Sequence, residues 1–328
     1  MAQHTLTFDV SAEVGTGEAL TQAAWLFLPE DPSAATAVLL CLAGGTYDKR
    51  YWHLEVPGRR GYSFAEHLAG QGYIVVALDH LGVGGSSDPE RSGDVGLPLL
   101  AAGDAAVAVQ LRARMRAGAL VPGLPSLDLP LVGVGHSMGA CLTTMMQAQE
   151  RPYDAVVLLG YGVQISNVHE AAIDAEDLHA RITQSLAAFR ERTGTAPDAV
   201  STIVPRQRLR QLFHAPDVPD DVIAADDAAE SRVPVLAASE VTTPGYVQRY
   251  AAVVDVPVFV ALGAVLDVSP DPYAELAGYR ASQDVTLHLV AGSAHCHNFA
   301  GNRVVLWDHI AAWVPRVTAR AAAPVAAN

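Results

Sequence analysis

The sequence predicts an α/β fold in which a mostly parallel central sheet is flanked by helices and carries an inserted helical cap. Two patterns in the 328 residues lead to this prediction. Short apolar runs rich in β-branched residues alternate with helical stretches, and they lack the polar–apolar alternation of strands that face water, so they are typical of strands buried on both faces. The alternation stops at about residues 162–243, where helical stripes continue without a strand. We therefore predict a core of residues 1–161 and 244–328 and a cap of residues 162–243.

The predicted strands and helices follow one another along the chain. Residues 5–10 and 25–28 alternate in a way that suits early antiparallel strands. The continuous runs lie at residues 38–42, 73–78, 129–134, 154–159, 256–262 and 285–290. Helices fit between them at 97–116, 138–149 and 303–314, and Pro315 should end or kink the last one. In the cap, a stripe from Leu178 to Phe189 is helical, and Thr243 with Pro244 predicts a further helix start.

Charge and residue usage exclude several functions. The formal net charge of −14 argues against nucleic acid and anionic membrane surfaces as partners, because both attract basic patches. Lys49 is the only lysine and no phosphate-loop motif precedes it, so lysine-dependent phosphate binding is not expected. The three cysteines are widely spaced, which favours a reduced, cytoplasmic protein. Neither a secretory signal nor a membrane span is expected, and the sequence leaves a homo-oligomer open.

The strongest motif is Gly135-x-Ser137-x-Gly139, which lies between a predicted strand and a predicted helix. A serine on such a tight turn projects its hydroxyl group from the sheet edge, and glycines two residues away relieve the crowding. The start of the helix directs backbone N–H groups at developing negative charge. We therefore predict that Ser137 is a nucleophile; the alternative is a glycine-rich turn with a structural serine.

The same glycines also resemble a dinucleotide-binding fingerprint. That motif requires an acidic residue at the end of the following strand to hold the ribose. Here the following strand ends in Leu159 and Gly160, and its only acidic residue, Asp154, lies at its start. This pattern disfavours a nicotinamide cofactor, and no cofactor is predicted.

With this elbow, the chain from about residue 37 to 313 resembles the α/β-hydrolase superfamily, whose catalytic triad runs Ser, then Asp or Glu, then His. The resemblance implies that the acid follows the strand after the cap, where Asp267 ends a short glycine-led turn, and that Asp271 is instead a helix cap. The family's Gly-x-x-His spacing selects His295 as the base, with His297 as the competitor and otherwise a pocket residue. A metal site at His295, His297 and Asp267 is not supported by any ligand motif.

The resemblance also implies an oxyanion hole. One donor should be the backbone N–H of Met138, and the other should follow the strand at residues 38–42. Many relatives have His-Gly there, whereas this chain has Ala43 and Gly44, so the second donor is Gly45 or Thr46, and we take Gly45. Thr46, Tyr47, His136 and His297 are candidate substrate-binding residues. Each has a structural alternative: Tyr47 with Tyr51 and Trp52 as packing beneath the cap, and His136 as a buried support of the elbow.

The resemblance implies a serine hydrolase that acts on a small-molecule carboxylic ester or lactone. The cap and the segment that leaves it supply Leu178, Ile182, Phe213, Val222 and Tyr246, which either line an apolar pocket or pack onto the core. With the negative net charge, they favour a neutral, largely apolar substrate. Arg206, Arg208 and Arg210 are expected to be solvated, with a basic patch for a substrate carboxylate as the alternative, and Lys49 and Arg50 are also expected to be solvated. Amide or C–C hydrolysis, acyl transfer and a non-catalytic small-molecule-binding protein remain the alternatives.

Overall fold

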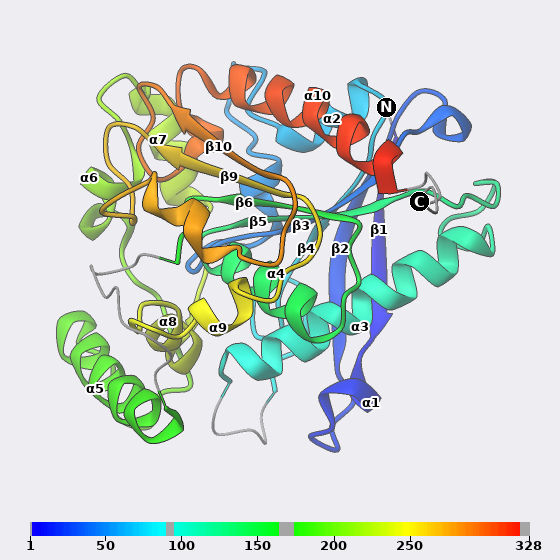
Figure 1. Ribbon diagram of the computed structural model, residues 1–328. Helices are drawn as coiled ribbons and strands as arrows, with labels where there is room; N and C mark the ends of the chain where they lie inside the picture. The colour runs from blue at the N-terminus through cyan, green and yellow to red at the C-terminus, as the bar shows by residue number, and fades with distance from the viewer. Residues whose placement is uncertain (1, 90–94, 164–173, 322–328) are drawn as a thin grey trace.

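The computed structural model describes residues 2–89, 95–163 and 174–321, and its centre is an eight-stranded sheet (Figure 1). The strand order is β1-β2-β4-β3-β5-β6-β9-β10; β1 and β2 pair antiparallel with their neighbours, and all other pairs are parallel. The strands are β1 (Ala2–Asp9), β2 (Thr21–Leu28), β3 (Val38–Leu42), β4 (Ile74–Leu78), β5 (Leu131–His136), β6 (Ala155–Leu159), β9 (Val258–Gly263) and β10 (Val285–Val290). The predicted fold class and the early antiparallel strands are confirmed.

Helices cover both faces of the sheet. Figure 1 shows α2 (Phe64–Gly70) and α10 (Arg303–Ala321) on one face, and α3 (Leu97–Arg116) and α4 (Met138–Gln149) on the other. Alternate side chains of β3 enter the two apolar cores: Val38, Leu40 and Leu42 join the core beneath α3 and α4, whereas Leu39 and Cys41 join the other. Burial on both faces explains the continuous apolar runs of the parallel strands β3, β4, β5, β6 and β9. The prediction of full burial is wrong for β10, which is at the edge of the sheet and is mostly only partly buried. None of the helices that the structure describes is long and apolar enough to cross a membrane.

Most of the elements between β6 and β9 are helical and gather at the carboxyl ends of the parallel strands (Figure 1). They are α5 (Ala175–Thr193), β7 (Ser201–Thr202), a 3-10 turn at Arg206–Arg208, α6 (Arg210–Phe213), α7 (Asp220–Ala228), β8 (Val233–Pro234), α8 (Val235–Val241) and α9 (Gln248–Ala251). Helix α5 contains the predicted stripe. The division into core and cap at residues 162 and 243 stays a prediction, and residues 164–173 of that segment lie outside the described residues.

The ends and the middle of this inserted segment pack differently. Leu178 of α5 and Tyr246 belong to the core beneath α3 and α4, whereas Phe213 and Val222 belong to the core on the opposite face of the sheet. All four side chains are buried. These contacts pack the insertion onto the sheet, and a role of the same residues in lining an apolar substrate pocket stays a prediction.

The predicted helix start at Thr243 is wrong, and Pro315 does not end its helix, whereas a kink there stays a prediction. Thr243 does not begin a helix: its hydroxyl donates to the carbonyl oxygen of Ser239 in α8, and the next helix begins only at Gln248. Helix α10 also runs through Pro315. Proline has no N–H to bond the carbonyl of Ala311, four residues earlier, and the hydroxyl of Tyr73 donates to that carbonyl instead at 2.6 Å.

The expectation that Lys49 is solvated is also wrong. Its ammonium group pairs with the carboxylate of Asp79, which lies fully buried at the end of β4. The same carboxylate accepts the backbone N–H groups of Lys49 and Gly85, at 2.7 and 2.8 Å. Arg50 pairs with Asp48 at 2.7 Å and remains partly exposed. The single lysine therefore neutralises a buried charge between two loops at the carboxyl edge of the sheet.

Replacing Lys49 should destabilise the fold. Lys49→Met keeps the aliphatic chain but leaves the Asp79 charge buried without a cation, which costs about 3 kcal/mol. Urea denaturation at pH 7 measures this change. The control is Arg116→Met, whose exposed pair with Asp128 should contribute less than about 1 kcal/mol. Equal losses for the two variants would show that the Lys49 pair contributes no more than a surface pair.

Candidate active site

Ser137 occupies a strained turn between β5 and α4. Its φ of 53° and ψ of −118° lie outside the regions that non-glycine residues usually adopt. A Cβ atom on Gly135 would lie 2.3 Å from the carbonyl oxygen of Gly139, and one on Gly139 would lie 2.1 Å from that of Leu42. The steric reason predicted for the two glycines is thus confirmed. Ser137 is partly exposed, although the residues on both sides of it are buried.

Asp267 and His295 lie together beside the same edge of the sheet. Asp267 follows β9 and His295 follows β10, and the carboxyl ends of these neighbouring parallel strands bring the two loops into contact. The Nδ1 atom of His295 lies 2.7 Å from Oδ1 of Asp267. Burial alone raises the pKa of the Asp267 carboxyl, but the attraction and hydrogen bonds of His295 and His297 hold it well below its usual range. Asp267 is therefore a carboxylate at neutral pH.

His297 is bonded to the second oxygen of the same carboxylate. Its Nε2 atom lies 3.0 Å from Oδ2 of Asp267, and its remaining nitrogen, Nδ1, is buried with no hydrogen-bond partner among the described residues. His295 uses the opposite nitrogen, Nδ1, and so keeps Nε2 for a further partner. The two histidines therefore differ in which ring nitrogen remains for chemistry.

His136 supports the elbow from below. It is fully buried, its ring stacks on Tyr51 with 4.4 Å between centroids, and its Nε2–H donates to the carbonyl oxygen of His295 at 2.8 Å. Burial, with His295 and His297 nearby, holds the pKa of His136 well below its usual range, so this ring is neutral. The close fit leaves no room at Gly160, where a Cβ atom would lie 2.9 Å from Nε2 of His136. The structural alternative for His136 is thus the arrangement observed.

The loop after β3 approaches the serine closely. A Cβ atom on Gly44 would lie 2.9 Å from the Cβ atom of Ser137. Among the described residues, the backbone N–H groups of Gly45, Thr46 and Met138 have no hydrogen-bond acceptor. These three N–H groups, on two segments that meet at Ser137, are suited to bind an anionic oxygen. Gly45 itself lies between apolar neighbours, because a Cβ atom there would be 3.4 Å from Val233 and 3.8 Å from the sulfur of Met138.

The aromatic residues after this loop are packed beneath the insertion. Tyr47, Tyr51 and Trp52 are all buried. The Tyr47 ring stacks on Phe213 of α6, and its hydroxyl group bonds Asp226 of α7 at 3.1 Å and Cys296 at 3.2 Å. Protein partners therefore already occupy the hydroxyl group that was a candidate for substrate binding.

The expectation that Arg206 is solvated is wrong, and its contact with the turn at Thr46 is one that sequence reasoning missed. Arg206 is buried, and it binds both the hydroxyl and the carbonyl oxygen of Thr46. Arg208 and Arg210 are exposed, as predicted for all three. Alternate arginines on a short helical segment carry no signal that distinguishes the buried one. Asp271, which was predicted to cap a helix, accepts the backbone N–H groups of Tyr273 and Ala274 in the turn before the 3-10 helix Ala274–Gly278, whose N-cap residue is instead Tyr273.

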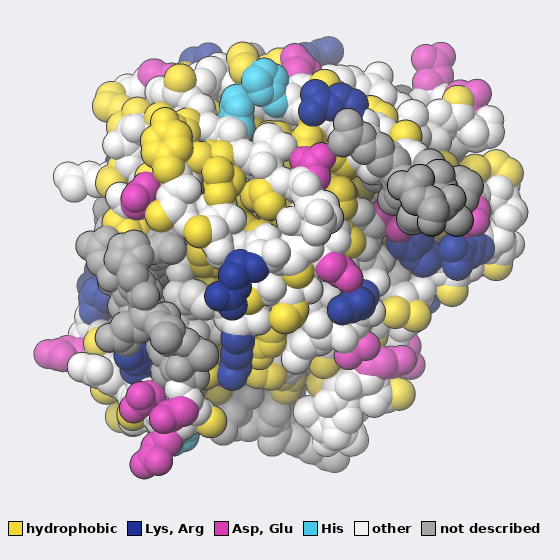
Figure 2. Space-filling view, viewed as in Figure 1, with side chains coloured by type: hydrophobic (Ala, Val, Ile, Leu, Met, Phe, Trp, Pro, Cys, Tyr) yellow, Lys and Arg dark blue, Asp and Glu magenta, His cyan; other side chains and the backbone are white. Residues whose placement is uncertain are grey.

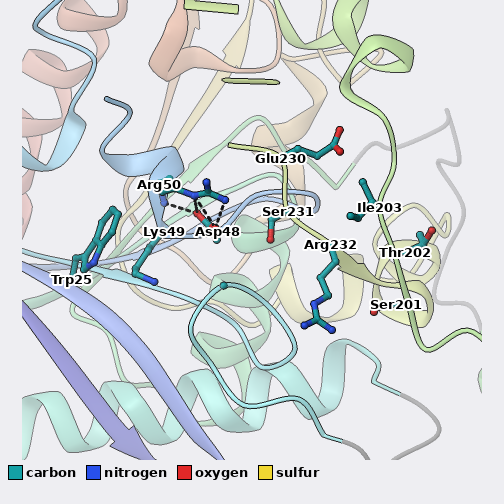
Figure 3. A pocket seen from close by; sticks show the side chains of 11 residues that line it. Trp25, Asp48, Lys49, Arg50, Ser201, Thr202, Ile203, Glu230, Ser231 and Arg232 are labelled. Atoms are coloured by element: carbon teal, nitrogen blue, oxygen red, sulfur yellow. Dashed lines mark hydrogen bonds and ion pairs between the residues drawn. The ribbon is translucent and has the colours of Figure 1, made fainter. Parts of the chain in front are cut away.

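A cleft of about 650 Å³ lies beside residues 230–232, the segment whose Ser231 binds the carbonyl oxygen of Thr46. Figure 3 shows Asp48, Lys49 and Arg50 on one side of it and Ser201 to Ile203 on the other. Each of its basic side chains has an acidic partner: Lys49 pairs with Asp79, Arg50 with Asp48, and Arg232 with Asp88. On the face of the molecule in Figure 2, basic side chains stand singly or in small groups among acidic and uncharged ones.

The described part of the chain contains no group of three or more His, Cys, Asp or Glu residues placed to hold a metal ion. Cys41, Cys141 and Cys296 are free and buried.

Comparison with known proteins identifies the family. Residues 39–306 match the model of the alpha/beta hydrolase family, and the chain belongs to it. A carboxyl esterase from Bacillus coagulans solved with glycerol is 17% identical, with a TM-score of 0.64 over 97% of this chain and 99% of that one. A thermophilic esterase from Thermogutta terrifontis with malate bound is 15% identical, with a TM-score of 0.66 over 96% and 99%. A bromoperoxidase from Bacillus anthracis is 16% identical, with a TM-score of 0.58 over 95% and 99%. No curated protein sequence matches the chain.

The ionised Asp267 should make stability depend on acid pH. Its pKa is lower in the folded than in the unfolded chain, so its stabilisation is complete above about pH 4, the unfolded value, and is lost as the pH falls through the folded pKa. Asp267→Asn should therefore lower the free energy of unfolding by about 1–3 kcal/mol at pH 7 and by less at pH 3. Urea denaturation at both pH values measures the difference. Asp271→Asn, in an exposed turn, is the control; a loss for Asp267→Asn that is the same at pH 3 and pH 7 would contradict the assigned ionisation.

Proposed function

We propose that the protein is a serine hydrolase that cleaves a carboxylic ester or lactone of a neutral, largely apolar small molecule. One arrangement carries the proposal: a partly exposed Ser137 on a strained elbow, at the same sheet edge as an Asp267–His295 pair whose imidazole keeps Nε2 for a proton. Family membership supports hydrolase chemistry. The two structurally similar esterases support the ester class, whereas the bromoperoxidase shows that this fold also serves other reactions.

In the proposed mechanism, Oγ of Ser137 attacks the carbonyl carbon while Nε2 of His295 takes the hydroxyl proton. Asp267 holds the imidazole through Nδ1 and stabilises its charged form. The N–H group of Met138 and those of the turn at Gly45 and Thr46 bind the oxyanion of the tetrahedral intermediate. His295 then returns the proton to the leaving alcohol oxygen, which leaves an acyl group on Ser137. Water, deprotonated by His295, attacks this acyl group, and the carboxylic acid departs as Ser137 recovers its proton.

Charge and local packing support the proposed substrate class. Val233 and Met138 flank Gly45, so the surroundings of the proposed oxyanion site are apolar. The net charge of −14 disfavours a strongly anionic substrate. The proposed mechanism needs no dissociable cofactor. Amide or C–C hydrolysis and acyl transfer with the same three residues are the alternative reactions, and a non-catalytic binding protein is the alternative class.

Removal of the serine hydroxyl tests the proposal directly. Ser137→Ala should abolish labelling by a fluorophosphonate probe and lower kcat for a p-nitrophenyl ester by at least about a thousandfold, because no other group can form the acyl-enzyme. The exposed Ser33→Ala is the control and should behave as wild type. Wild-type protein that is neither labelled nor faster than Ser137→Ala would falsify the hydrolase proposal and favour a binding protein.

The two histidines offer a matched pair for the base. His295→Gln and His297→Gln each remove one hydrogen bond to Asp267, so their unfolding free energies should fall by similar amounts, about 1–3 kcal/mol. Only His295→Gln removes the nitrogen that takes the serine proton, and its kcat should fall at least about a hundredfold further than that of His297→Gln. Steady-state kinetics and urea denaturation measure both quantities. The opposite order of kcat values would make His297 the base.

A further inference from the structure

Thr46 adopts a conformation that its side chain disfavours. The N–H of Tyr47 donates to the carbonyl oxygen of Gly44, and Thr46 has a φ of 71°, as at the third position of a type II turn. That position normally requires glycine or asparagine, and a β-branched residue with positive φ is a genuine outlier. In the commoner type I turn, the peptide between Gly45 and Thr46 is rotated by about half a turn, so its N–H and C=O exchange directions. Something outside the turn must therefore hold Thr46 in place.

Arg206 makes the contacts that do so. One guanidinium nitrogen donates to Oγ1 of Thr46 at 2.5 Å, and the other terminal nitrogen donates to the carbonyl oxygen of Thr46 at 2.7 Å. The backbone N–H of Ser231 fills the second acceptor position of that carbonyl at 3.0 Å. These bonds fix the directions of the side chain and of the carbonyl group at the Cα atom of Thr46. Because Cα is tetrahedral and has a fixed handedness, the direction of the backbone nitrogen is then fixed as well. The planar fork of Arg206 thus sets the orientation of the Gly45–Thr46 peptide.

Arg206 is itself firmly held. Its side chain is 3% exposed, its guanidinium carbon lies 3.6 Å from the centre of the Tyr47 ring, and its Nε atom lies 3.7 Å from the buried carboxylate of Asp226. Its backbone N–H donates to the carboxylate of Glu230 at 2.9 Å. A buried guanidinium with a carboxylate partner and an aromatic face has little freedom, so it can impose a geometry on the turn.

We propose that Arg206 is a positioning residue that keeps the oxyanion turn in its active form by holding Thr46 at positive φ. The proposal rests on the proposed hydrolase function, because the N–H groups of Gly45 and Thr46 are the candidate donors of that turn. Through Arg206, the inserted segment is then a structural part of the oxyanion site. In the absence of the fork, the turn relaxes towards type I, and the carbonyl of Gly45 takes the direction of the Thr46 N–H.

Kinetics of Arg206→Met measure this role. The variant keeps the apolar stem of the side chain and loses the guanidinium fork. Its kcat for a p-nitrophenyl ester should fall about tenfold to a hundredfold, which is no more than the loss of a whole oxyanion donor causes. Its KM should change less than about threefold. Arg206→Lys, with one ammonium group in place of the fork, should fall in between. The control is Arg208→Met, two residues away and exposed, which should match wild type. An unchanged kcat in a folded Arg206→Met protein would overturn the proposal.

A second substitution separates positioning from general structural support. Glycine adopts a φ of 71° freely, so Thr46→Gly in the Arg206→Met background should recover part of the lost kcat, by about fivefold or more. No recovery would mean that Arg206 supports the site in some other way, and the proposal fails. If Arg206→Met does not fold, Thr46→Val removes only one bond of the fork while keeping the side-chain volume. It should lower kcat several-fold, and a Thr46→Val kcat equal to wild type would overturn the proposal.

Fluorophosphonate labelling distinguishes this failure from failure of the hydrolase proposal. If wild-type Ser137 is not labelled, the hydrolase function itself is wrong. If wild type is labelled, a folded Arg206→Met should reach the same final extent of labelling at a lower rate, because the nucleophile is intact and only its oxyanion site is displaced. Labelling of Arg206→Met at the wild-type rate would overturn the role of Arg206 alone.

Discussion

The turn from β5 into α4 within a single residue is the constraint on which the rest of the site depends. To make it, Ser137 takes a left-handed conformation, and the backbone of Gly139 comes so close to β3 that a methyl group there would lie 2.1 Å from the carbonyl oxygen of Leu42. Two neighbouring strands are thereby locked together at their carboxyl ends. The loop after β3 must then pass directly over the serine, which is why Gly44 cannot carry a side chain. The strain of one residue thus dictates glycine at positions on three segments and brings the backbone donors to the nucleophile.

Buried carboxylates, each with specific partners, organise the loops around this turn. An ionised carboxylate in the interior is tolerated only when it is paired and hydrogen-bonded. Four aspartates meet this condition at or near the carboxyl edge of the sheet. Their partners are Lys49 for Asp79, Gln22 and His80 for Asp104, Arg206, His214 and Tyr47 for Asp226, and His295 and His297 for Asp267. Every one of these contacts joins segments distant in sequence, so the charges hold together the loops that surround Ser137. The single lysine of the chain thus neutralises a buried carboxylate instead of lying on the surface.

Sequence reasoning reached the parts of the fold that depend on local pattern. Uninterrupted apolar runs predicted the buried strands, and the glycine spacing around Ser137 predicted the elbow, because both follow from what neighbouring residues impose on one another. It failed where a distant group decides. Pro315 remains inside a helix because the hydroxyl of Tyr73 bonds the carbonyl that proline leaves free. Arg206 is buried because Asp226 and Thr46 supply partners for its guanidinium group. These partners are far away in the sequence, so the residues around Pro315 or Arg206 do not predict them. The same holds for His297, whose bond to Asp267 depends on the packing of two loops.

The inserted segment holds both loops that flank the serine, and this has a consequence for catalysis. On one side, Arg206 and Ser231 bind the Thr46 turn. On the other, the carbonyl oxygens of Leu212 and Phe213 accept the backbone N–H groups of His295 and Cys296, and the Phe213 ring lies 5.5 Å from that of His295. Residues 206–231 therefore connect the proposed base to the proposed oxyanion donors through a single packed unit. Helix α8 packs instead against α3 on the opposite face of the sheet, and α5 packs against α8. Residues 206–231 are therefore the part of the insertion that binds both halves of the site.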